Sequence, residues 1–96
     1  MASYNLSQQA KEDLIRIHQY GVRTFGEAPA DQYLKDIFDQ FEIIARYPDR
    51  YPNVNFIRKG YRRCLCGVDS IYYRVQNGTV EIMTIIGRQE MDDFNL

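Results

Sequence analysis

The dipeptide Asn77-Gly78 constrains the fold of this chain more than any other local feature. Both residue types accept the positive φ angles that a tight β-hairpin turn requires. Segments rich in β-branched and aromatic residues flank the dipeptide on each side. We therefore predict a hairpin that joins a strand at residues 70–75 to a strand at residues 79–86.

Two further strands are predicted upstream of this hairpin. Residues 54–59 and 61–66 have strand composition, with a turn at Gly60 between them and another turn at residues 67–69. Successive hairpins of this kind build an antiparallel sheet of three to four strands.

The first half of the chain carries helix signals instead. Alternation at residues 2–6 predicts a short opening strand, and Ser7 stands at the N-cap position of a helix over residues 8–26. A second helix should begin near Pro29 and end before Pro48. Each helix has one apolar stripe, formed by Leu14, Ile17, Gly21 and Phe25 in the first and by Leu34, Ile37, Phe38, Phe41, Ile44 and Ala45 in the second. The predicted fold class is α+β: an N-terminal strand, an α-helical hairpin, and an antiparallel sheet packed on the helices.

The length of 96 residues predicts a single domain over residues 1–96. The apolar runs are too short to cross a bilayer, and the first residues lack the features of a secretory signal, so the expected location is the cytoplasm. The acidic segment at residues 87–96 is open to three interpretations: a strand extension, a helical turn or a flexible tail.

Charge is segregated along the chain. Residues 27–42 hold five acidic residues against one lysine, whereas residues 46–63 hold six basic residues against one aspartate. Cations concentrated on a sheet in a chain of net charge -1 favour an anionic partner, either nucleic acid or an acidic protein. The predicted partner-binding residues are Arg58, Lys59, Arg62, Arg63, Arg74 and Arg88.

Enzyme signatures are missing from the sequence, and we predict no catalytic residue, no cofactor and no metal site. His18 is the only histidine, and Cys64 and Cys66 form an isolated C-x-C without the further ligands that zinc needs. Metal-free RNA cleavage does not depend on a recognisable sequence motif, because cations and a tyrosine proton donor could suffice for it. The candidate proton donors are Tyr61, Tyr72 and Tyr73, and the alternative is that the arginines form a solvated rim. The same tyrosines and Phe56 could stack on bases or fill the core.

Six segments carry a resemblance to a known family. They are Y-N-L-S-x-x-A-K-x-D-L from Tyr4, I-x-x-Y-x-x-x-x-F-G from Ile17, A-x-x-Y-L-K-x-I-x-x-x-F-x-x-I-A-R-x-P from Ala30, I-R-K-G-Y-R-R from Ile57, I-Y-Y-R-V from Ile71 and V-E-I-x-x-I-I-G-R from Val80. In this order and spacing, over residues 4–88, they resemble ParE-type toxins of the RelE/ParE toxin-antitoxin superfamily.

The resemblance implies a cytoplasmic toxin that inhibits DNA gyrase by binding and is not itself an enzyme. It implies neutralisation by a ParD-type antitoxin in a hetero-oligomer, contact with operator DNA only through that antitoxin, and a role in plasmid or chromosome stabilisation. Val22, Phe25, Tyr33 and Ile37 are candidate docking residues for the antitoxin, with the core as the alternative.

Two alternatives remain open at this point. A RelE-like ribosome-dependent messenger RNA endonuclease would share the fold; Arg58, Arg63 and Arg88 are compatible with it, but its C-terminal tyrosine is missing from the ending MDDFNL. The other alternative is a regulatory module that only tunes repression. Its own surface would read DNA poorly, because the second helix is acidic.

Overall fold

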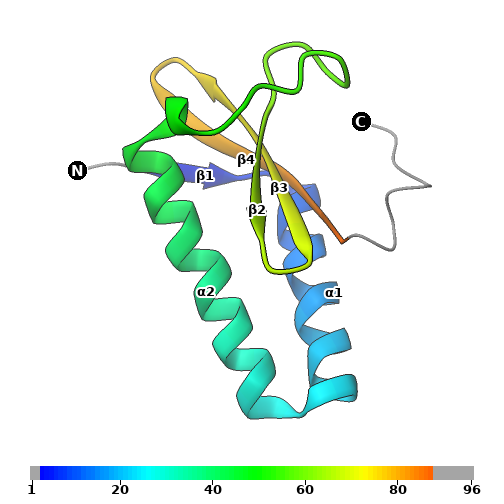
Figure 1. Ribbon diagram of the computed structural model, residues 1–96. Helices are drawn as coiled ribbons and strands as arrows, with labels where there is room; N and C mark the ends of the chain where they lie inside the picture. Colours follow the sequence, from blue (N-terminus) through cyan, green and yellow to red (C-terminus); the bar gives the residue numbers. More distant parts are fainter. Residues whose placement is uncertain (1–2, 88–96) are drawn as a thin grey trace.

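The computed structural model describes residues 3–87 and confirms the predicted α+β class (Figure 1). A short strand precedes two long helices, and three strands follow a 3-10 turn. The elements are β1 (Tyr4–Leu6), α1 (Gln8–Phe25), α2 (Glu27–Arg46), the 3-10 turn η1 (Pro48–Arg50), β2 (Arg62–Cys66), β3 (Asp69–Gln76) and β4 (Thr79–Gly87). The predicted strand at residues 2–6 is observed from Tyr4, and Ala2 lies outside the described residues.

The four strands form one mixed sheet in the order β1-β4-β3-β2. The predicted hairpin is confirmed: β3 and β4 are antiparallel, and φ is 54° at Asn77 and 75° at Gly78. β1 pairs in parallel with β4, which the helical hairpin permits by carrying the chain back across the sheet. The last strand therefore lies between the first strand and β3.

The predicted strand at residues 54–59 is wrong. Apart from one backbone hydrogen bond from Val54 N to the carbonyl oxygen of Tyr61 (2.8 Å), this segment folds on itself. The amides of Ile57 and Arg58 donate back to the carbonyl of Val54, and the side chain of Asn55 accepts from the amide of Gly60 at 2.9 Å. These local bonds replace the ladder that a strand would need.

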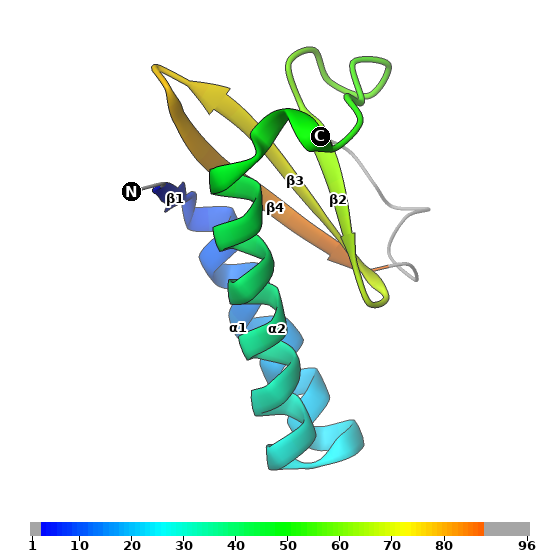
Figure 2. The same cartoon turned by 60° about the vertical axis from the view of Figure 1, so that its left-hand side comes forward.

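Both helices pack on one face of the sheet (Figures 1 and 2). Their apolar stripes meet the inward-facing side chains of β2, β3 and β4 in the main core. This core consists of Ala10, Leu14, Ile17, Ile37, Phe41, Ile44, Cys64, Ile71, Tyr73, Val80, Ile82 and Ile85. A smaller cluster of Val54, Tyr61 and Tyr72 lies on the opposite face, because Tyr72 alternates with its inward-facing neighbours along β3.

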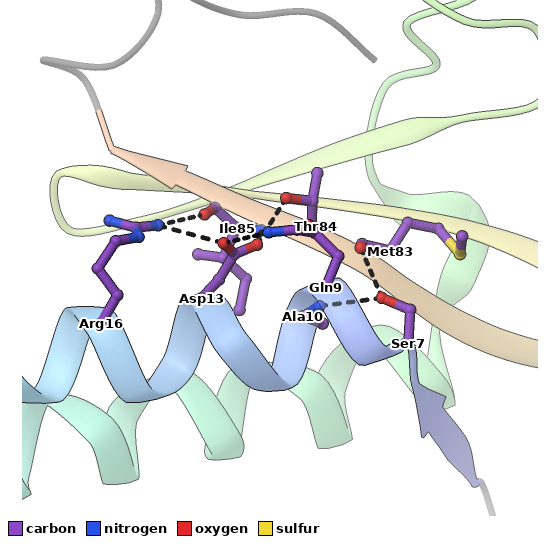
Figure 3. A network of polar contacts seen from close by, with 8 residues as sticks. All are labelled: Ser7, Gln9, Ala10, Asp13, Arg16, Met83, Thr84 and Ile85. Atoms are coloured by element: carbon purple, nitrogen blue, oxygen red, sulfur yellow. Dashed lines mark hydrogen bonds and ion pairs between the residues drawn. The ribbon is translucent and has the colours of Figure 1, made fainter.

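A buried carboxylate joins α1 to the outer edge of β4 (Figure 3). Asp13, a residue that is 5% exposed, accepts hydrogen bonds through Oδ2 from Thr84 Oγ1 (2.6 Å) and from the amide of Ile85 (3.0 Å). Arg16 donates to the carbonyl of Ile85 at 3.1 Å. Both backbone groups of Ile85 are thus satisfied by side chains of one helix.

Ser7, at the N-cap of α1, makes the same kind of contact. Its hydroxyl donates to the carbonyl of Met83 (2.6 Å) and also caps α1 by accepting from the amide of Ala10 (3.0 Å). β1 ends opposite Ile82, and a bulge between Tyr72 and Tyr73 leaves Met83 as the extra residue on β4. Helix α1 therefore takes over as hydrogen-bonding partner of β4 at the residue where β1 stops.

Replacing Asp13 by Ala should destabilise the protein by about 1–3 kcal/mol, because the buried amide of Ile85 loses its acceptor. Asp13→Asn should recover part of this loss, since its amide oxygen can still accept one hydrogen bond. Urea unfolding measures the difference, with Glu12→Ala as the control on the exposed side of the same helix turn. Equal stability of the Asp13→Ala and Glu12→Ala variants would contradict this role.

Candidate functional site

The predicted partner-binding cations lie in three places. Arg58 and Lys59 are exposed in the loop before β2, Arg62 and Arg63 lie on β2, and Arg74 lies on β3. Arg88 lies outside the described residues. Of the five described cations, three thus lie on the sheet and two in the loop before it.

Two of the cations are engaged within the fold. Arg74 pairs with Glu81 at 2.8 Å (Nε to Oε1), directly opposite it across the β3–β4 hairpin. Arg62 donates to the carbonyl of Tyr51 at 2.6 Å and lies 3.8 Å from the carboxylate of Asp49. Arg62 therefore connects the segment after α2 to the edge strand β2. Neither Arg74 nor Arg62 offers an unpaired charge.

The remaining charge is centred on the loop at residues 53–61, which we call the basic loop. It carries Arg58 and Lys59, and the guanidinium of Arg58 lies 5.6 Å from the ring centre of Tyr61. Arg63 follows on β2 and faces away from the helices, since the next residue, Cys64, is buried in the main core. These three cations form no ion pair with a carboxylate among residues 3–87.

The aromatic candidates divide sharply by burial. Tyr72 and Tyr73 are fully buried and Tyr61 is 6% exposed, so the core interpretation is right for the tyrosines. The hydroxyl of Tyr73 donates to the carbonyl of Pro48, and burial raises the pKa of this phenol. Phe56 is the exception, with 81% of the residue exposed. The tyrosines are thus poorly placed to protonate a bound RNA.

The histidine and the cysteines are bound into the structure in other ways. His18 Nε2 lies 2.7 Å from Asp31 Oδ1, which links α1 to α2 at the surface. Cys64 is buried and Cys66 half-buried, and burial, followed by the neighbouring thiol, raises the pKa of Cys66 to about 11. No group of His, Cys, Asp and Glu residues within residues 3–87 is arranged to hold a metal ion.

A groove between the two helices was not predicted. It has a volume of about 300 Å³ and is lined by Leu14, Ile15, His18, Gln19, Leu34 and Phe38. Ile15 is an apolar residue beside the apolar stripe of α1, and this extra apolar position is the sequence signal that could have indicated the groove. In the structure Ile15 is 57% exposed. We call this feature the helical groove.

The candidate docking residues differ in accessibility. Ile37 is fully buried in the main core, and Val22 is half-buried. The hydroxyl of Tyr33 lies within hydrogen-bonding distance of Asp69 Oδ2 (2.6 Å) and of the Cys66 carbonyl (2.9 Å). Phe25, at 67% exposed, is the most accessible of the four, close to the tip of the helical hairpin.

Within residues 3–87, no helix combines the length and the apolar character needed to cross a membrane.

Comparison with known proteins defines the class to which this arrangement belongs. Residues 4–92 match the family model described as "ParE toxin of type II toxin-antitoxin system, parDE". Toxin ParE1 of Caulobacter vibrioides is 35% identical over 86 residues, covering 90% of this chain and 88% of the relative. Toxin ParE1 of Mycobacterium tuberculosis is 32% identical over 95 residues, covering 97% and 96%.

The fold is also found in a solved structure described as "Chromosomal ParDE TA system from P. aeruginosa". It superposes with a TM-score of 0.80 at 21% identity, covering 91% of this chain and 96% of that one. The chain belongs to the ParE toxin family of type II toxin-antitoxin systems. The resemblance read from the sequence is thereby confirmed.

Proposed function

We propose that this chain inhibits DNA gyrase in the cytoplasm by binding to it, and that a ParD-type antitoxin neutralises it in a hetero-oligomer. The observation that carries the proposal is the family match over residues 4–92. Inhibition would stabilise a cleaved gyrase-DNA state, so that the toxin supplies binding energy and gyrase supplies the chemistry.

The distribution of side chains favours binding over catalysis. A metal-free nuclease needs an accessible proton donor near its cations. Here the three candidate donors, Tyr61, Tyr72 and Tyr73, are buried, and Arg74 is paired with Glu81.

The alternative is RelE-like ribosome-dependent cleavage of messenger RNA. Arg58 and Arg63 keep it open, because neither forms an ion pair with a carboxylate within residues 3–87. Operator binding by the toxin itself is disfavoured, since α2 displays acidic residues and offers no basic recognition helix. Contact with operator DNA would come through the antitoxin.

Rates of macromolecular synthesis after induction of the chain separate these functions. We expect thymidine incorporation to fall while leucine incorporation continues, and the antitoxin encoded beside the toxin should restore thymidine incorporation. Cells carrying the empty vector are the control. An early fall in leucine incorporation accompanied by cleaved messenger RNA would instead support the RelE-like function.

The helical groove is the proposed binding site of the antitoxin, which would lie across the helical hairpin and reach the sheet. Its lining is mainly apolar, with Leu14, Ile15, Leu34 and Phe38 beside two polar residues. An amphipathic helix buries apolar anchors in such a groove, and its polar side remains in water. Ile15 and Gln19 are exposed at the groove, so a partner can reach this face of the hairpin.

Ile15→Asp should weaken antitoxin binding by about tenfold or more, because the complex would bury an unpaired carboxylate in an apolar contact. Isothermal titration calorimetry with the purified antitoxin measures the affinity. Lys11→Asp is the matched control. It changes the net charge by more than Ile15→Asp does, and Lys11 is an exposed residue of the same helix outside the groove. Equal affinities of the two variants would remove the groove from the interface.

A further inference from the structure

The basic loop displays one flat apolar side chain among polar and cationic neighbours. Phe56 is 81% exposed, more than any other large hydrophobic residue described. Asn55 precedes it, and Arg58 and Lys59 follow shortly after, all of them exposed. Neither the proposed gyrase inhibition nor the antitoxin groove accounts for this arrangement.

The backbone of the loop is held in place by its own hydrogen bonds. Val54 and Tyr61 close its base through a bond of 2.8 Å, and both side chains pack with Tyr72 in the small outer cluster. Inside the loop, the amide of Arg58 donates to the carbonyl of Val54 (3.0 Å), and the amide of Gly60 donates to Asn55 Oδ1 (2.9 Å). Phe56 is therefore presented by an ordered support, which lowers the entropic cost of using it as a contact.

The charged residues in the sequence of the loop and its flanks all have one sign. The sequence from Arg50 to Val68 contains no Asp or Glu, and its cations are Arg50, Arg58, Lys59, Arg62 and Arg63. Arg62 is engaged by Tyr51 and Asp49, and the guanidinium of Arg50 lies over the ring of Tyr47 at 4.4 Å from its centre. Arg58, Lys59 and Arg63 remain to face a ligand. A carboxylate that would repel phosphate groups is missing from this whole stretch.

We propose that the basic loop binds an unstacked single strand of nucleic acid. Phe56 would stack on one base, and Arg58, Lys59 and Arg63 would contact the phosphates on either side. Aromatic stacking combined with cations along the backbone is the usual basis of sequence-tolerant single-strand binding.

This ligand fits the loop better than an acidic protein does. The aromatic anchor of a protein interface normally occupies the centre of a desolvated patch. Phe56 is instead flanked in the chain by Asn55 and by the half-buried Ile57, with exposed Arg58 and Lys59 beyond. Binding of this kind is distinct from reading a duplex operator, for which the toxin has no recognition helix.

Fluorescence anisotropy with fluorescein-labelled oligo(dT) and oligo(U) of equal length tests the proposal on the full chain at low ionic strength. Phe56→Ala should weaken binding by about tenfold, and Phe56→Tyr should retain it because the flat ring remains. Tyr20→Ala removes another exposed aromatic residue, on α1, and should change nothing.

Salt titration measures the phosphate contacts separately. The double variant Arg58→Ala/Lys59→Ala should lower the slope of log affinity against log salt by about 1.4, since each contact with a single strand contributes about 0.7. Lys11→Ala/Arg23→Ala, which removes two exposed cations from α1, should leave the slope unchanged. Tighter binding of oligo(U) than of oligo(dT) would identify RNA as the source of the strand. Equal binding would show that the loop contacts bases and phosphates and not the 2′-hydroxyl.

Two results would overturn the proposal. One is wild-type affinity in a folded Phe56→Ala variant, with folding checked by thermal unfolding. The other is no binding of either oligonucleotide by the wild-type chain; if the Phe56→Ala variant then also failed to inhibit gyrase, the loop would be a contact for an acidic protein. Because the oligonucleotide assay contains no gyrase, its outcome is independent of the proposed gyrase inhibition.

Discussion

Hydrogen bonds that β4 donates to the buried carboxylate of Asp13 fix α1 against the sheet. β4 is an inner strand only as far as Ile82, where β1 ends, and beyond that residue its outer backbone groups would be exposed at an edge. Asp13 accepts from the amide of Ile85, and Ser7 donates to the carbonyl of Met83. The first turns of α1 therefore replace a neighbouring strand, which fixes the helical hairpin relative to the sheet. Both candidate surfaces depend on this frame, because one lies between the helices and the other is supported by the sheet.

These surfaces differ in chemistry and in position. The helical groove is apolar and belongs to the hairpin, whereas the basic loop is cationic and lies at the opposite end of the molecule from the hairpin tip (Figures 1 and 2). A chain of net charge -1 thus separates an acidic helix α2 from a basic end. For a protein proposed to act through partners, this separation gives each partner a surface of matching character. The buried tyrosines Tyr61, Tyr72 and Tyr73 belong to the two apolar clusters of the fold.

Local signals predicted most of the fold. Asn77-Gly78 fixed the hairpin, Ser7 and Gly26 delimited α1, and Pro48 marked the end of α2. The pairing of Arg74 with Glu81 can also be predicted from the sequence, because a two-residue turn at Asn77-Gly78 sets these residues opposite each other. The prediction of a strand at residues 54–59 was wrong because hydrogen bonds to Asn55 and Val54 close a loop there. Amino-acid composition does not reveal these bonds. Contacts such as Arg62 with the Tyr51 carbonyl, and the bulge at Met83, depend on the packed structure and have no local signature.

Binding to gyrase is the activity that we propose for this member of the ParE family. The most direct test is gyrase-catalysed supercoiling of relaxed plasmid with increasing amounts of the purified protein, scored for supercoiled and for linear DNA. Inhibition by binding predicts loss of supercoiling together with accumulation of linear DNA, and suppression of both effects by the neighbouring antitoxin. Undiminished supercoiling at a large molar excess of folded protein would contradict it and point to another target.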